Sequence, residues 1–134
     1  MSTTPRSPRN QKLHDTILIT LQTVYEKAKG ANEVFVNAGE SKNSSIKGHY
    51  PDVIAQYTGK PPIVFEIETD ETVNEAEVLQ WKSFQEAFGL FYLIVPAMLE
   101  SKAIQILTKN NLSKIIVTGY RWKENKLVFT NKLP

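Results

Sequence analysis

The sequence predicts an α/β fold with helices on both sides of a mixed central sheet. Three observations predict it: apolar residues at helical spacing near the start, a hairpin-rich run of β-type segments after them, and β-α-β units in the second half. Hairpins pair antiparallel strands and β-α-β units pair parallel ones, so one sheet holds both kinds. The 134 residues suffice for one domain, expected over 12–134. Residues 1–11, rich in Ser, Thr, Pro and Arg, are expected to form a disordered basic tail.

The first half of the chain predicts one helix and three strands. The helix is expected over 12–29, because apolar residues follow one face and Gly30 supplies a stop. The β-type segments and their connections are the strands 33–37, 49–57 and 63–68, the loop 39–48 and the turn 58–62.

The second half predicts two helices and the remaining strands. A capping box, Thr72-Val73-Asn74-Glu75, opens a helix that ends near Gly89. Its sheet-facing side is expected to carry Val73, Ala76, Gln80, Ser83, Phe84 and Ala87. The apolar run 90–95 predicts a strand buried on both faces. The last elements are a helix at 98–109, a strand at 114–118 and a hairpin that joins 120–122 to 127–129.

Composition excludes several classes of protein. With 41% apolar and 22% charged residues, the chain is neither wholly disordered nor a collagen or coiled-coil rod. It has no cysteine, which excludes disulfides, thiolate catalysis and cysteine-based metal centres. No secretory signal is evident, and the longest apolar run, Leu90 to Leu99, has 10 residues where a membrane span needs ~20. We therefore expect a cytoplasmic protein with no membrane partner.

Charge is unevenly distributed along the chain. Residues 1–60 carry 8 basic and 5 acidic side chains, residues 61–100 carry 1 and 8, and residues 101–134 carry 7 and 1. An acidic centre between basic segments is typical of a cation site beside a surface for a polyanion. It also arises when exposed helix faces differ in charge, and both interpretations stay open.

Two glutamates stand on the third predicted strand, where apolar residues are expected. Glu66 and Glu68 alternate with Phe65 and Ile67, so they share one face roughly 7 Å apart along the strand. Burial of like charges this close requires a counter-charge, unless the strand faces solvent. Asp70 and Glu71 follow with no lysine nearby, and a divalent cation is the simplest counter-charge for such a cluster.

Asp52 is expected to join these glutamates. If the strands 49–57 and 63–68 pair across the turn 58–62, Glu68 lies opposite Asp52 and Glu66 lies opposite Ile54. All three carboxylates then share a face. Hard oxygen ligands of this kind suit Mg²⁺ or Mn²⁺, so the three carboxylates together are a candidate metal site.

This arrangement resembles the PD-(D/E)xK nuclease superfamily, which includes restriction endonucleases and junction resolvases. The matching residues are Pro51-Asp52, thirteen intervening residues, and Glu66-Ile67-Glu68. The superfamily core has the element order αβββαβ, the order predicted here over 12–95. The resemblance implies a restriction endonuclease-like fold and a Mg²⁺- or Mn²⁺-dependent nuclease that hydrolyses DNA phosphodiester bonds.

The resemblance also implies roles for individual residues, with Asp52 and Glu66 as the ligands of the metal ion. Glu68 stands in the place of the superfamily's lysine and would act as a general base or second metal ligand. Some members supply a polar residue from the following helix, and Gln80 is the candidate, either to orient water or phosphate or as a core hydrogen-bonding group. Lys82 and Glu26 are candidates whose alternative is a solvated position, and His14 is not expected to be catalytic.

Two functions from different classes remain open at this point. The first is a DNA endonuclease with Asp52, Glu66, Glu68 and Gln80 in the active site; a homodimer would supply the two sites needed to cut both strands. The alternative is a catalytically inactive nuclease-like module that binds nucleic acid or a protein partner, which the missing lysine favours.

Overall fold

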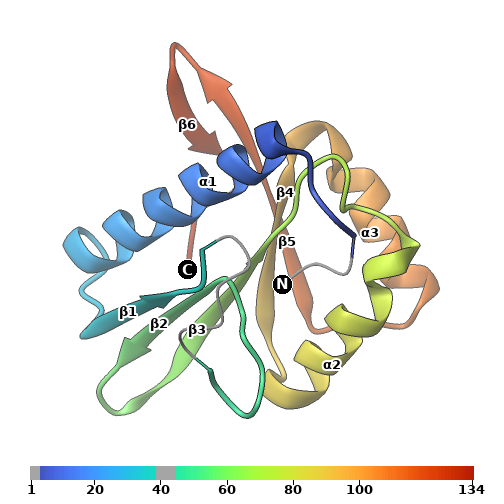
Figure 1. Cartoon of the computed structure of the whole chain (residues 1–134). Helices are drawn as coiled ribbons and strands as arrows, with labels where there is room; N and C mark the ends of the chain where they lie inside the picture. Colours follow the sequence, from blue (N-terminus) through green and yellow to red (C-terminus); the bar gives the residue numbers. More distant parts are fainter. Residues whose placement is uncertain (1–3, 39–44) are drawn as a thin grey trace.

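A six-stranded sheet with helices on both faces forms the computed structural model, which describes residues 4–38 and 45–134 (Figure 1). The elements are α1 (Pro8–Lys27), β1 (Glu33–Val36), β2 (Val53–Tyr57), β3 (Lys60–Ile67), the 3-10 helix η1 (Glu75–Glu77), α2 (Val78–Phe88), β4 (Phe91–Pro96), the 3-10 helix η2 (Ala97–Leu99), α3 (Glu100–Lys109), β5 (Ile115–Lys123) and β6 (Lys126–Phe129). Strands follow chain order across the sheet. The β3–β4 and β4–β5 pairs are parallel and the other three are antiparallel, which confirms a mixed α/β sheet.

Each face of the sheet has its own apolar core. On one face, α1 packs through Ile17, Leu18, Leu21 and Tyr25 against the first strands. On the other, α2 and α3 pack against the middle of the sheet through Trp81, Phe84, Ala103, Ile106 and Leu107. Strand β4 contributes Ile94 to the first core, and Leu93 and Val95 to the second, which confirms the prediction of a strand buried on both faces.

Helix α1 begins at Pro8, four residues before the predicted start. Ser7 is the N-cap, and its hydroxyl accepts a hydrogen bond from the Asn10 backbone N–H at 3.2 Å. Proline is well suited to the first helical position, because its missing N–H would have no partner there. The tail expected over 1–11 is therefore helical from Pro8, and residues 1–3 lie outside the described residues.

The β2–β3 hairpin has a tighter turn than predicted. Strand β3 begins at Lys60, and Gly59 adopts a φ of +77° that suits glycine. The pairs Val53↔Phe65 and Tyr57↔Lys60 show a register shift between Ala55 and Tyr57. The expected pairing of Asp52 with Glu68 is therefore wrong by two residues. Asp52 lies opposite Glu66, one pair beyond Val53↔Phe65.

The predicted face of the second helix is also wrong in part. Thr72 does not cap it; Asn74 caps η1 instead, and its side chain accepts a hydrogen bond from the Ala76 N–H at 2.8 Å. Because a 3-10 turn advances more per residue than an α-helix, the buried stripe of α2 is displaced. Its fully buried side chain is Trp81, whereas Ser83 is exposed.

The C-terminal hairpin is present as predicted, although β5 extends further than the expected 114–118. Glu124 and Asn125 connect β5 to β6 with φ values of 51° and 65°. Two consecutive left-handed residues form the type I′ turn that matches strand twist in a hairpin.

No helix in the described part of the chain is long and apolar enough to cross a bilayer. The loop expected at 39–48 falls mostly on residues 39–44, which lie outside the described residues.

Candidate functional site

Asp52 directly precedes β2, and Glu66 lies near the carboxyl end of β3. The two residues lie side by side. Both are buried, at 1% and 0% relative exposure. The Asp52 backbone N–H donates to Glu66 Oε1 at 2.9 Å, and the Ile67 N–H donates to Asp52 Oδ2 at 2.8 Å. These two bonds hold both carboxylates in fixed positions. The structure thus brings together the two residues that the sequence predicts as metal ligands.

Glu68 follows directly after β3 and shares the α2 side of the sheet with Glu66. Its Oε2 accepts a hydrogen bond from Trp81 Nε1 at 2.7 Å, and Arg6 Nη2 lies 3.4 Å from its Oε1. The Tyr120 hydroxyl donates to the Glu68 carbonyl oxygen at 3.1 Å. Contacts from α2, from β5 and from the segment before α1 therefore hold this buried residue.

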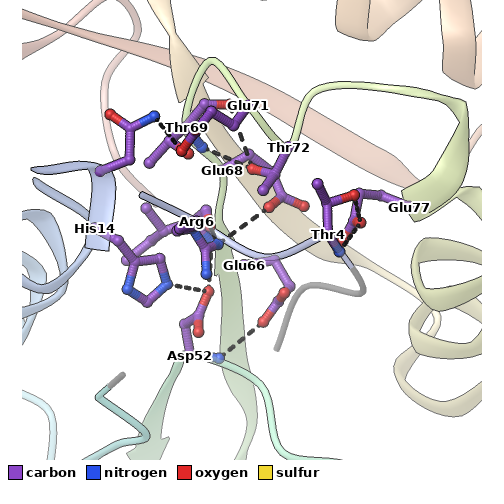
Figure 2. A network of polar contacts seen from close by, with 12 residues as sticks. Thr4, Arg6, His14, Asp52, Glu66, Glu68, Thr69, Glu71, Thr72 and Glu77 are labelled. Atoms are coloured by element: carbon purple, nitrogen blue, oxygen red, sulfur yellow. Dashed lines mark hydrogen bonds and ion pairs between the residues drawn. The ribbon is translucent and has the colours of Figure 1, made fainter. Parts of the chain in front are cut away.

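The N-terminal segment supplies partners for the acids that follow β3. Thr4 donates to Glu77 Oε2 from both its N–H and its hydroxyl, each at 2.9 Å (Figure 2). The further contacts of this kind are Arg6 with the Ile67 carbonyl at 2.9 Å, the Ser7 N–H with Glu71 at 2.9 Å, and the Asn10 amide with Asp70 at 2.5 Å and Glu71 at 2.7 Å. Asp70 and Glu71 are exposed and accept these bonds from the neutral Ser7 N–H and Asn10 amide, so they lie apart from the buried pair Asp52 and Glu66.

His14 on α1 is the partner of Asp52. Its Nε2 lies 3.1 Å from Asp52 Oδ2, its Nδ1 lies 3.0 Å from Asp15 Oδ1, and the ring is fully buried. Burial alone lowers the pKa of His14, but the charge of the nearby Asp52 carboxylate outweighs burial and raises it. Burial alone raises the pKa of Asp52, and the charge of His14 brings it well below its usual range.

The pKa values of the two glutamates are raised, whereas that of Asp52 is lowered, because burial dominates for the glutamates. Burial raises the pKa of Glu66 well above its ordinary value, and the Asp52 charge raises it further. Burial raises the pKa of Glu68 to about 7, although the Trp81 hydrogen bond opposes this shift. An added positive charge would lower both pKa values, since it would favour the ionised carboxylates.

Gln80 does not join the carboxylate cluster, which consists of Asp52, Glu66 and Glu68. The side chain is half-buried, and its Oε1 is shielded from solvent without a hydrogen-bond partner among the described residues. Trp81, its neighbour on α2, occupies the position toward Glu68 instead. Lys82 and Glu26 are exposed, in line with the solvated alternative for each.

Sequence reasoning missed Arg6, His14 and Trp81 as members of the site. A signal for His14 was present, because it lies in helical phase with the buried residues Leu18, Leu21 and Tyr25. Arg6 has no such signal: it is separated from Glu68 by 62 positions and belongs to no predicted element.

The donor chemistry of the site fits a hard divalent cation at Asp52 and Glu66. Both are buried carboxylates on adjacent strands, and carboxylate oxygens are the ligands that Mg²⁺ and Mn²⁺ prefer. Within residues 4–38 and 45–134, no three His, Asp or Glu side chains are arranged around one point for a metal. Glu68, the expected third carboxylate, is directed to Arg6 and Trp81.

Comparison with protein-family models and with curated proteins found no match to this chain.

Proposed function

We propose that this protein is a metal-dependent nuclease that hydrolyses DNA phosphodiester bonds, with Asp52 and Glu66 as ligands of a Mg²⁺ or Mn²⁺ ion. The observation that carries the proposal is the pair of hydrogen bonds, from the Asp52 N–H to Glu66 and from the Ile67 N–H to Asp52, that fixes these two buried carboxylates next to each other. The element order α1-β1-β2-β3-α2-β4 supports it, since this is the order of the PD-(D/E)xK core that the motif resembles.

Each acidic residue has a distinct role in this proposal. Asp52 and Glu66 would hold the ion, which when bound would supply positive charge to polarise the scissile phosphate and to stabilise the leaving oxygen. His14 and the Ile67 N–H keep Asp52 ionised and oriented. Glu68, with a pKa of about 7, suits a general base that accepts a proton from the attacking water near neutral pH. No contact in the structure supports the role that the resemblance implies for Gln80.

A surface cavity of about 340 Å³ beside the cluster is the proposed path of the DNA backbone. Arg9, Arg121 and the half-exposed Trp122 line it, and Tyr120 connects it to Glu68 through the hydrogen bond to the Glu68 carbonyl. Arginines bind phosphate oxygens and aromatic rings stack on bases. Lys123 and Lys126, both exposed on the β5–β6 hairpin, extend the basic surface.

One observation favours the second candidate, a catalytically inactive module that binds nucleic acid or a protein partner. Two of the three carboxylates already face basic side chains of the chain itself, Asp52 facing His14 and Glu68 facing Arg6. A cluster neutralised in this way can be structural. This candidate predicts salt-dependent DNA binding without cleavage, and thermal stability that Mn²⁺ leaves unchanged.

The experiment that tests the proposal compares wild type with Asp52→Asn, Glu66→Gln and the control Glu26→Gln. Each variant replaces one carboxyl group by its amide, but Glu26 is exposed on α1. We expect cleavage of duplex, single-stranded or branched DNA with Mg²⁺ or Mn²⁺, reduced by about 100-fold or more in the first two variants and unchanged in the control. Absence of cleavage on every substrate with both metals would exclude the nuclease and leave the binding module.

A further inference from the structure

The segment Thr4–Ser7, called the N-terminal strap below, lies across the carboxylate cluster before the chain enters α1. It contains no helix or strand, and side-chain and backbone contacts hold it in place. Thr4 bonds Glu77 at one end and Ser7 bonds Glu71 at the other. Between them, Arg6 reaches inward until only 4% of its side chain is exposed. The strap is thus a short irregular segment that inserts one buried cation into an acidic site.

The position of the Arg6 guanidinium is the basis of the inference. Its Nη2 donates to the carbonyl of Ile67, the residue between the two glutamates, and lies 3.4 Å from Glu68 Oε1. Figure 2 shows the Arg6 side chain between His14 and Glu68, above Asp52 and Glu66. A guanidinium keeps its charge at every accessible pH. Arg6 therefore acts as a permanent internal counter-ion for Glu68, beside Asp52 and Glu66.

A divalent cation at Asp52 and Glu66 would meet this guanidinium at close range. Two cations in one buried site repel each other strongly, because the low dielectric of the interior screens them weakly. The strap can yield, since it lies outside every helix and strand and α1 begins only at Pro8. The carboxylates of Asp52 and Glu66 cannot move away in the same way, because hydrogen bonds from backbone N–H groups hold them.

We propose that the N-terminal strap and a divalent cation compete for the carboxylate cluster, so that the strap covers the site without metal and leaves it when metal binds. The inference rests on the proposed metal site and adds a regulation of that site. Competition is reciprocal: docking of the strap weakens metal binding by the same factor by which metal weakens docking of the strap.

Manganese binding to the full-length chain tests this competition. Calorimetry or the electron paramagnetic resonance of free Mn²⁺ compares wild type, Arg6→Met and the matched control Lys12→Met. Both variants remove one positive charge, but Lys12 is exposed on α1. We expect Arg6→Met to bind Mn²⁺ roughly 5–150-fold more tightly, the usual range of coupling between two sites, and Lys12→Met to match wild type.

A second measurement uses wild type alone and does not depend on how Arg6→Met folds. Trypsin cleaves after arginine, and the Arg6–Ser7 bond is protected while Arg6 is buried. We expect Mn²⁺ to accelerate cleavage after Arg6 by at least fivefold in the protein and to leave a free peptide of residues 1–10 unaffected. In Asp52→Asn, where metal binding is weakened, Mn²⁺ should no longer accelerate it.

The outcomes separate the strap from the proposed function. If wild type binds Mn²⁺ but Arg6→Met binds it equally or more weakly, the strap proposal is wrong and the metal site stands. If Mn²⁺ slows cleavage after Arg6 or leaves it unchanged while binding at Asp52, the strap proposal is wrong as well. If neither wild type nor Arg6→Met binds Mn²⁺, the metal site and its competition with the strap both fall.

Discussion

At the scale of single residues, Glu68 shows how the chain itself stabilises a buried carboxyl group. A fully buried charge without partners would be very costly, so the residue would exchange its charge for a proton. The Trp81 indole and the Arg6 guanidinium reduce this cost, but burial still dominates and sets the pKa at about 7. The native state therefore holds a proton on Glu68 at pH values where the unfolded chain has lost it.

This difference predicts a pH dependence of stability. Because the folded pKa of Glu68 is about 7 and its ordinary value is 4.5, its stabilising contribution is complete below pH 4.5 and is lost as pH rises through 7. We expect the unfolding free energy of Glu68→Gln to fall less than that of wild type between pH 4.5 and 7.5, by at most about 3 kcal/mol. Urea titrations at several pH values measure it. Glu86→Gln, an exposed acid on α2, is the control, and parallel curves for Glu68→Gln and wild type would contradict the prediction.

At the scale of elements, β5 is positioned by close packing against the turn that precedes α3. A Cβ atom at Gly119 would lie 2.9 Å from Ala97 Cα and would clash with the Glu100 carboxylate. The Gly119 N–H donates to Thr130 Oγ1 at 2.9 Å, and the Thr130 hydroxyl in turn donates to Glu100 Oε1. Glycine is thus required here by a close approach of backbones, since this residue has an ordinary φ.

Gly119→Ala should therefore destabilise the fold through overpacking. We expect a loss of about 1–3 kcal/mol, because the Ala97 backbone has to move away from β5. Ser101→Ala, an exposed position in α3, should change stability by no more than about 0.5 kcal/mol. Urea unfolding followed by circular dichroism measures both, and equal midpoints for the two variants would show that η2 is free to shift.

At the scale of the whole molecule, the two apolar cores are separate clusters that share one sheet. Tyr25 and Phe65 belong to the α1 side, with ring centroids 5.2 Å apart, and Trp81 belongs to the side of α2 and α3. Strand β4 places alternate residues in both clusters. Loss of either core leaves the sheet with one uncovered apolar face, so the two cores should unfold together.

Leu21→Ala tests this coupling across the sheet. The substitution removes buried methyl groups from the α1 side and should cost about 2–5 kcal/mol. In a Trp122→Phe background, the fluorescence of Trp81 reports the opposite core. We expect its urea midpoint to shift together with the circular dichroism midpoint. A Trp81 transition that stays at the position of the Trp122→Phe parent would show two independently unfolding halves.

Local patterns predicted most of the elements but not the details that shape the site. The run 90–95 and the hairpin after Tyr120 were predictable, because strand alternation, turn residues and apolar runs act over a few neighbouring residues. The β2–β3 register was not, because it depends on a tight turn and an irregularity near Ala55. The burial of Trp81 in place of Gln80 also escaped prediction, because a short 3-10 turn changed the helical phase.

The amino-acid sequence alone was enough to establish a mixed α/β order and to single out Asp52 and Glu66, because strand periodicity and an unexpected acid in an apolar strand are local features. Only the folded chain decided what surrounds them. Arg6 and Glu68 meet across 62 positions, and His14 meets Asp52 from the far side of the hairpin. No spacing in a sequence encodes such meetings, since they follow from how α1 and its N-terminal strap dock onto the end of the sheet.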